Sequence, residues 1–231
     1  MRNIKKPEQI VPPQRNGNWI QTYTGLSFYP NDLRPEDIDI NDIAHALSLI
    51  CRFNGHCTEF YSVAEHSVRV SRYMQARYAR CKMEMPSPDV CSIYGLMHDT
   101  PEAYITDIPR PIKIDLPQFK VLEDSIYIEI LKKFKLRGDY KSVKNYFNGF
   151  ETRERYFPAR KFITIDEAVH LADNILLATE KRDIMRREPQ SWGLMAPPLK
   201  KRIIPYSPRE AERLFLNEFY RLYEGMNNNE N

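Results

Sequence analysis

The densest group of side chains that could do chemistry lies in residues 94–111, YGLMHDTPEAYITDIPRP. It holds an imidazole at His98 and three carboxylates at Asp99, Glu102 and Asp107. An apolar run leads into this group, and burying such polar side chains without partners would cost several kcal/mol. The stretch is therefore either a charged helix end in water or part of a site that binds a cation.

Two further polar residues interrupt apolar helical patterns. His66 lies within SVAEHSVRV, and Asp173 lies within VHLADNILLA. One divalent cation held between three helices would satisfy all of these groups together. Two imidazoles with two carboxylates suit a first-row transition metal and leave positions open for water and substrate. We therefore predict a metal site whose ligands are His66, His98, Asp99 and Asp173.

Some of these positions have simpler interpretations when each is taken alone. A single histidine such as His66 on an apolar helix face is more often an ordinary core residue. His170 and Asp166 share nearly the same helix face as Asp173. His170 either orients a metal ligand or lies on the helix surface. The hypothesis of a metal site therefore depends on the complete set of four residues and on their order.

That order, His…His-Asp…Asp, resembles the HD-domain metal-dependent phosphohydrolases. The stretch HDTPEAYITDIPRPIK is similar to the H-D-x-x-E-x-x-x-x-D-x-P-x-P-x-K pattern of the bacterial and phage 5′-deoxynucleotidase branch. Upstream, DIAHALSLICRFNGHCTEFYSVAEHS is similar to the segment that brings a phosphate-binding arginine near the first metal histidine. The resemblance covers residues 18–135 and 164–220, which is most of the chain.

The resemblance implies a role for each matching residue. The four ligands would hold one divalent transition metal (Co, Mn, Zn, Fe or Ni), and Mg²⁺ is a further candidate at the substrate phosphates. Arg52 matches the phosphate-binding arginine, whose planar guanidinium suits bidentate contact. Glu102 matches the catalytic glutamate, and Asp107 matches an acid that positions water or the leaving group. The metal would activate water, and Glu102 or Asp107 would protonate the departing 5′-oxygen.

Four further residues are candidates for contact with the substrate. His45 and His56 bracket Arg52, and His45 lies two helical turns before it, so that the two could share a face. Lys113 could reach a phosphate, although a lysine after a proline loop is commonly only solvated. Trp19, with other aromatic residues of the N-terminal segment, either stacks on a base or packs a hairpin.

We expect an enzyme that removes phosphate from deoxynucleotides, a 5′-deoxynucleotidase that converts a dNMP to a deoxynucleoside and phosphate. A dNTP triphosphohydrolase would use the same metal and arginine, so the sequence leaves both activities open. Guanosine tetraphosphate hydrolysis is disfavoured because Ala103 follows Glu102. Cyclic-dinucleotide cleavage is disfavoured because the sequence lacks the extended motif of those enzymes. A di-iron oxygenase would need further histidine ligands near the site. A nucleotide sensor or partner-binding protein without activity is the non-enzymatic alternative, and the complete ligand set argues against it.

The elements that must position these residues are mostly helices. Residues 18–29, NWIQTYTGLSFY, predict a short β-hairpin around Thr24-Gly25. Apolar periodicity predicts a first helix with Asp42 as its cap, and the full set of expected helices is 43–53, 62–80, 90–106, 118–136, 163–185 and 207–225. The expected fold class is all-α, an HD-domain helical bundle with a small N-terminal hairpin.

The 231 residues suffice for one substantial core. We expect a flexible arm at 1–17, a single HD domain at 18–225 with an insertion at 137–162, and a disordered tail at 226–231. The amphipathic helices 118–136 and 207–223 offer surface for a homodimer or a higher homo-oligomer.

Composition narrows the setting of the protein. The net charge of +3, from 34 basic and 31 acidic residues, is too small for a DNA-wrapping surface, and we expect no sequence-specific binding to nucleic acid. No apolar run approaches the roughly 20 residues of a membrane helix, and the N-terminus lacks the apolar core of a signal peptide. The four cysteines show no C-x-x-C spacing, so we expect reduced thiols in the cytoplasm and no zinc ribbon: Cys51, Cys57, Cys81 and Cys91.

Overall fold

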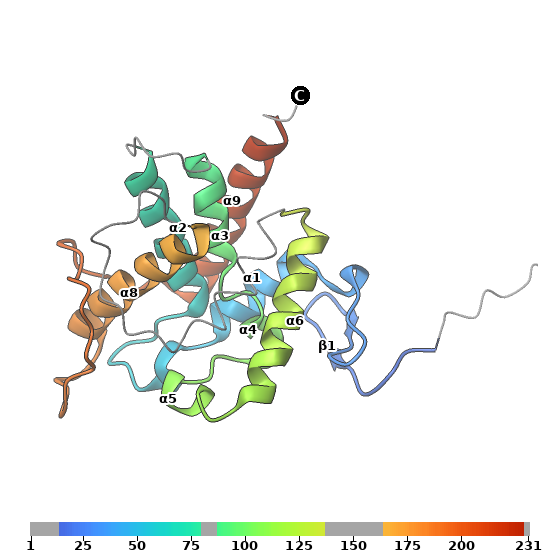
Figure 1. Ribbon diagram of the computed structural model, residues 1–231, viewed down its shortest axis with the longest axis horizontal. Helices are drawn as coiled ribbons and strands as arrows, with labels where there is room; N and C mark the ends of the chain where they lie inside the picture. Colours follow the sequence, from blue (N-terminus) through green and yellow to red (C-terminus); the bar gives the residue numbers. More distant parts are fainter. Residues whose placement is uncertain (1–13, 80–86, 137–163, 229–231) are drawn as a thin grey trace, which may run out of the picture.

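The computed structural model describes residues 14–79, 87–136 and 164–228 of the chain. The predicted insertion at 137–162, Cys81 and most of the predicted N-terminal arm lie outside these ranges. Helices dominate the described residues, and one two-stranded sheet lies near the N-terminus (Figure 1). The prediction of a mostly helical fold with a small hairpin is confirmed.

The hairpin consists of β1 (Ile20–Gln21) and β2 (Ser27–Phe28), which pair antiparallel. It is followed by a short 3₁₀ helix, η1 (Pro35–Asp37), and by α1 (Ile40–Leu49). The prediction that Asp42 caps the first helix is wrong. Asp39 is the N-cap of α1 and accepts a hydrogen bond from the Asn41 amide, whereas Asp42 accepts hydrogen bonds from the Thr24 amide and hydroxyl and so ties the hairpin to α1.

The centre of the bundle is formed by α2 (Val63–Tyr78) and α3 (Pro88–Met97), which make the most extensive helix–helix contact among the described residues. Ser62 and Ser87 cap these helices by accepting bonds from backbone amides one turn later. Gly95 permits the close approach of α3 to α2, because a Cβ there would lie 2.6 Å from Met74 Sδ and 3.3 Å from Ser71 Cα.

The sequence predicts a helix over 90–106 with a local irregularity at Pro101, and the structure shows a full break between Met97 and Glu102. After α3 the chain makes a tight turn and forms α4 (Glu102–Ile105), then α5 (Arg110–Lys113) and α6 (Pro117–Lys133). Pro101 stands at the start of α4, where a missing amide donor costs nothing. The break places residues 98–101 in a turn at the end of α3, directly beside α2 and α8 (Ile165–Ile184).

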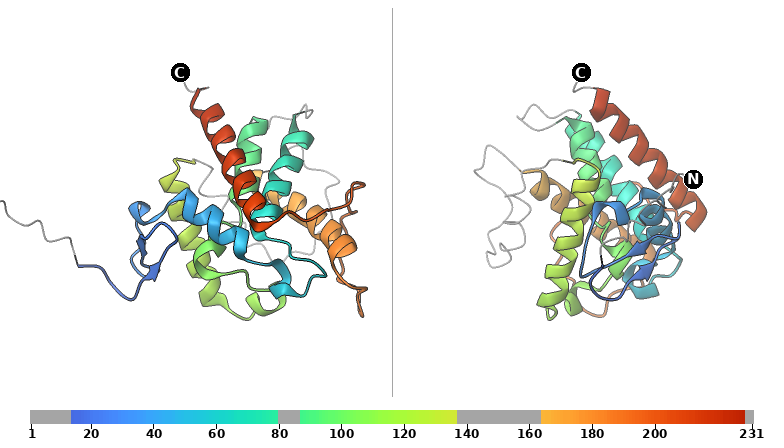
Figure 2. Two further views of the ribbon diagram at one scale, coloured as in Figure 1. Left: turned by 180° about the vertical axis from the view of Figure 1, so that it is seen from behind. Right: turned by 90° about the vertical axis from the view of Figure 1, so that its right-hand side faces the viewer.

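The last described helix, α9 (Pro208–Asn228), crosses the outside of the bundle and contacts α1, α2 and α3 (Figure 2). Its apolar residues belong to the main core, with Phe215, Phe219 and Leu222 fully or almost fully buried. The apolar face of this helix, which the sequence offers as an oligomer surface, is therefore covered by the chain's own core.

Two structural details lie at the predicted domain boundaries, which stay predictions. The helix α9 extends to Asn228, past the predicted start of a disordered tail at residue 226. At the other end, Arg15 lies in the predicted flexible arm, yet its guanidinium binds the carboxylates of Asp32 and Asp37. Among the described residues, none of the helices combines the length and apolar character of a membrane span.

Candidate metal centre

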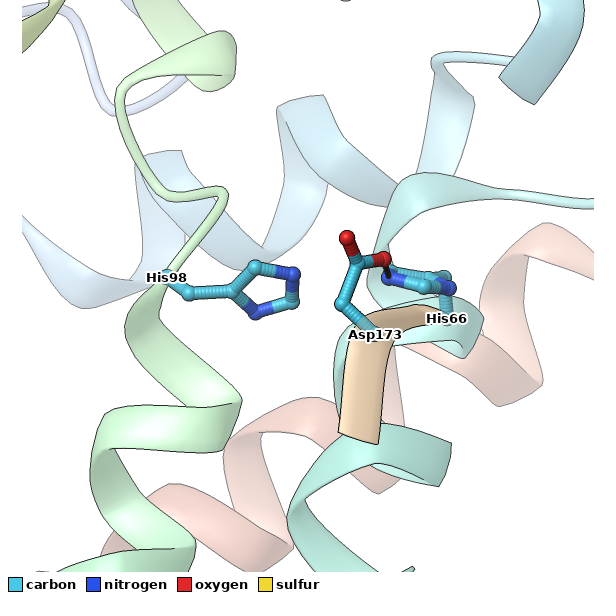
Figure 3. A group of neighbouring side chains, drawn as sticks. All are labelled: His66, His98 and Asp173. Atoms are coloured by element: carbon cyan, nitrogen blue, oxygen red, sulfur yellow. Dashed lines mark ion pairs between the residues drawn. The ribbon is translucent and has the colours of Figure 1, made fainter. Parts of the chain in front are cut away.

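Three predicted ligands meet where α2, α3 and α8 approach one another. His66 lies one turn into α2, His98 follows the last residue of α3, and Asp173 lies in the middle of α8. Figure 3 shows the three side chains turned toward a common point, and one ligand atom from each lies within 4.8 Å of the others. Residues distant in sequence are thus brought together by helix packing.

The fourth predicted ligand, Asp99, joins the same group from the turn after α3. Its Oδ2 lies 3.2 Å from His98 Nε2 and 3.7 Å from His66 Nε2. On the opposite side, Asp173 Oδ1 lies 3.2 Å from His66 Nε2. The structure therefore groups ligand atoms of His66, His98 and Asp173 within 4.8 Å of one another, and it places a carboxylate oxygen of Asp99 beside both imidazoles.

The donor set fits a divalent cation. The Nε2 atoms of His66 and His98 are buried and have no hydrogen-bond partner among the residues that the structure describes. The other ring nitrogen of each is engaged, because His98 Nδ1 donates to the Gly95 carbonyl at 2.8 Å and His66 Nδ1 lies 2.6 Å from Glu180 Oε1. These contacts favour the tautomers in which both Nε2 lone pairs face the centre. A first-row transition metal would supply the missing partner for both nitrogens.

The electrostatics of the centre are those of a cation site. Burial and the Arg52 guanidinium lower the pKa of His66, but the carboxylates of Glu180 and Asp173 outweigh them and bring it to about 9. Burial raises the pKa of Asp173, yet the adjacent His66 imidazole, whose Nε2 lies 3.2 Å away, lowers it overall to about 2. The carboxylates thus remain ionised, and their combined charge attracts positive charge to the centre.

Arg52 lies beside these ligands in a short 3₁₀ helix, η2 (Arg52–Gly55). Its side chain is 11% exposed, its Nη1 lies 3.5 Å from Asp99 Oδ2, and its Nε has no partner among the described residues. The backbone after it runs left-handed through Phe53 and Asn54, with φ of 57° and 51°. Such residues each cost about 1–2 kcal/mol, and they fix the direction in which the chain leaves Arg52.

Glu102 lies next to this group at the start of α4. Its side chain is buried, and its Oε1 lies 3.7 Å from Lys113 Nζ. Burial raises the pKa of Glu102 well above its usual value, and the nearby charges of Asp99 and Asp107 raise it further. A raised pKa favours the protonated carboxyl group, which is the form that can donate a proton.

Asp107 follows the turn at Thr106 and shares this electrostatic environment. Burial and the charge of Asp99 raise its pKa, whereas Arg52 and Lys113 act in the opposite direction. Lys113 is held by Glu123, whose Oε1 lies 2.7 Å from its Nζ. The predicted acids and the predicted lysine therefore lie within electrostatic reach of the metal ligands.

Comparison with known proteins identifies two relatives of the chain. The uncharacterized protein YfdR of Escherichia coli (strain K12) is 33% identical over 211 residues, which cover 90% of this chain and 97% of that protein. The chain belongs to the YfdR family. An uncharacterized protein of Rhodobacter capsulatus is 32% identical over 121 residues, which cover 51% of the chain and 59% of that protein. No family model matches the chain.

Three residues of this YfdR-family chain that were predicted to contact the substrate have other neighbours than the metal ligands: His45, His56 and Trp19. His45 is stacked under Tyr23 of the hairpin, with ring centroids 3.7 Å apart, and its Nδ1 lies 3.3 Å from Glu212 Oε2. His56 is exposed at the end of η2. Trp19 is 52% exposed just before β1. This exposure does not favour a packed position for Trp19 on the hairpin, and its stacking on a base stays a prediction.

One residue at the centre escaped the sequence analysis of this YfdR-family protein. Glu180 is fully buried on α8, two turns after Asp173, and contacts both His66 and Arg52. Burial raises its pKa, but the charges of Arg52 and His66 lower it overall, so the carboxylate is ionised. Its seven-residue spacing from Asp173 puts both on one helix face. In the sequence, this spacing from Asp173 is the signal by which Glu180 could have been identified.

Proposed function

We propose that the protein is a metal-dependent phosphohydrolase of the HD type that acts on deoxynucleotides as a 5′-deoxynucleotidase. The observation that carries this proposal is the convergence of two buried imidazole Nε2 atoms and two carboxylates beside Arg52. A buried arginine with an unpartnered Nε next to a candidate metal centre suits the binding of a phosphate, which needs both positive charge and donors.

The side chains divide the work of phosphate-ester hydrolysis between them. His66, His98, Asp99 and Asp173 would hold the metal, which supplies Lewis-acid activation of water and of the phosphoryl group when it is bound. Arg52 binds the phosphoryl oxygens and offsets the charge that develops on them. Glu102, whose raised pKa favours the protonated form, delivers a proton to the departing 5′-oxygen.

The balance of charge favours a monophosphate over a triphosphate. Arg52 and Lys113 are basic side chains beside the acids of the centre, and Lys113 is already paired with Glu123. Besides Glu102, whose raised pKa favours its neutral form, four carboxylates surround Arg52: Asp99, Asp107, Asp173 and Glu180. A triphosphate would bring several negative charges into this field without enough cations to balance them. Triphosphohydrolase activity, the alternative from sequence, is therefore the second candidate.

An assay of purified protein separates the two activities. Apo protein reconstituted with Mn²⁺, Co²⁺ or Zn²⁺ is incubated with each dNMP and each dNTP, and the products are separated as phosphate or triphosphate. We expect phosphate and deoxynucleoside from dNMPs, and no turnover by the Asp99→Asn variant. Triphosphate released from dNTPs would establish the second candidate instead. Turnover of neither class in any metal form would overturn the proposal.

A further inference from the structure

Glu180 connects the candidate metal ligands to the candidate phosphate-binding arginine. Its Oε1 lies 2.6 Å from His66 Nδ1, and its Oε2 lies 3.2 Å from Arg52 Nη2. The side chain has no exposure to solvent. A buried carboxylate is expensive unless its charge is used by close partners. Here each oxygen faces a different part of the site.

Arg52 has a second carboxylate within reach. Its Nη1 lies 3.5 Å from Asp99 Oδ2, so the guanidinium sits between Asp99 and Glu180. Asp99 is also a candidate metal ligand, only 3.2 Å from His98 Nε2. An arginine paired fully with Asp99 would compete with a cation for that carboxylate, and it would turn away its donors from a phosphate.

We propose that Glu180 is a positioning residue that limits the pairing of Arg52 with Asp99 to one long contact while it fixes the His66 ring with Nε2 toward the metal. This inference rests on the proposed function, because it takes His66 and Asp99 as metal ligands. Loss of the Glu180 charge leaves Asp99 as the closest carboxylate partner of Arg52, and leaves the Nδ1 proton of His66 without its acceptor. Both changes weaken metal binding, by two separable routes.

The test measures metal affinity without any substrate. Apo protein is titrated with Co²⁺ in competition with a chelator of known affinity, and the visible absorption of Co²⁺ reports its coordination. We expect Glu180→Gln to weaken Co²⁺ binding by about 10- to 100-fold, as removal of a partner behind a ligating histidine typically does. Glu180→Asp keeps the charge with a shorter reach, so an intermediate loss is expected, and it serves as the readout if the glutamine variant does not fold.

Glu65→Gln is the matched control. Glu65 is also a fully buried carboxylate, and it pairs with Arg69 and the Tyr206 amide instead of the centre. The Glu65→Gln substitution should lower the melting temperature and leave the Co²⁺ affinity and the absorption spectrum unchanged. An equal loss of affinity in both variants would mean that any buried charge lost from this core has the same effect, and would overturn the inference.

A double-mutant cycle isolates the effect on Arg52. Arg52→Ala should recover part of the Co²⁺ affinity in the Glu180→Gln background, and this gain should exceed the gain that Arg52→Ala gives in the wild type. Equal gains in the two backgrounds would show that Glu180 does not restrain Arg52. A Glu180→Gln variant that binds Co²⁺ as tightly as the wild type would overturn this inference and leave the proposed function standing. Absence of Co²⁺ binding by the wild type would overturn the inference and the proposed function together.

Discussion

His98 donates a hydrogen bond through Nδ1 to the carbonyl of Gly95, 2.8 Å away and one helical turn earlier. Gly95 is also the residue at which α3 approaches α2 most tightly, since a Cβ there would lie 3.3 Å from the Ser71 backbone. The orientation of a candidate metal ligand and the packing of the two central helices therefore depend on the same residue.

The substitution Gly95→Ala should consequently lower both stability and metal affinity. The new methyl group must displace Met74 Sδ and press on α2, which costs about 1–3 kcal/mol by overpacking. Thermal melting and Co²⁺ titration measure the two effects. The helical glycine Gly225 is the control, because a Cβ there meets Asp89 Oδ2 only at 3.7 Å. Gly225→Ala should raise stability by up to about 1 kcal/mol. A Gly95→Ala protein as stable as wild type would contradict the close approach.

Metal binding should stabilise the folded chain, because the ligands come from separate helices and meet only in the fold. Ligand at about 100 times its dissociation constant contributes about 2.7 kcal/mol. For a domain of this size that corresponds to a rise of roughly 5–10 °C in melting temperature over chelator-treated protein.

The Asp173→Asn variant should lose this rise. Asp183→Asn is the control on the same helix, since Asp183 binds the Ile203 amide and Arg182 instead of the centre. It should melt at a lower temperature than wild type and still respond to metal. A metal-induced rise that survives Asp173→Asn would place the bound metal elsewhere.

Glu102→Gln should reduce kcat by about 10²- to 10⁴-fold, because glutamine keeps the shape of the side chain and cannot deliver a proton. The KM and the metal-induced rise in melting temperature should change little. An aryl phosphate such as p-nitrophenyl phosphate has a leaving group that needs no proton, so the defect should shrink on that substrate. The same defect on a dNMP and on the aryl phosphate would exclude Glu102 as the proton donor.

Asp166, in the first turn of α8, should reduce stability at neutral pH. Burial and the charge of Glu167 raise its pKa from 3.8 to about 6. The folded state therefore binds more protons than the unfolded state between these values, and stability falls as the pH rises through that window. Asp166→Asn removes the penalty, so its gain in melting temperature over wild type should be larger at pH 8 than at pH 4.

Asp183 supplies the comparison of opposite sign. Its hydrogen bonds from Arg182 lower its pKa, so its contribution is present at neutral pH and is lost as the pH falls below the usual carboxylate range. Asp183→Asn should therefore cost more stability at pH 8 than at low pH. The two variants should show opposite trends in the same buffers, and parallel trends would contradict the assigned environments.

The sequence was most informative where a polar residue interrupted an apolar helix. His66 and Asp173 stand out for this reason, and His98-Asp99 stands out through its motif, so the residues of the candidate centre could be chosen without coordinates. Glu180 could not be chosen in this way. It lies near the polar end of its helix, where a glutamate is ordinarily solvated, and only the approach of α2 and Arg52 shows that it is buried.

The sequence could not decide which aspartate caps α1 or what covers the apolar face of α9, because both depend on contacts between distant segments. Asp39 and Asp42 are both acceptable helix caps, and the contact of Asp42 with Thr24 of the hairpin decides between them. The amphipathic pattern of α9 is equally compatible with an internal or an external partner, and its burial against α1, α2 and α3 is a property of the whole fold. Patterns along one segment do not contain such long-range contacts.

The position of α9 has a consequence for how the protein is made. The helices α1, α2 and α3 leave the ribosome well before the helix that covers them, so the growing chain carries uncovered apolar surface until Phe215, Phe219 and Leu222 have emerged. Asp173 is also synthesised late, so a metal ion cannot tie the early helices together in the meantime. The early helices therefore keep apolar surface uncovered until synthesis is nearly complete, and binding of a metal at this centre could not shorten that interval.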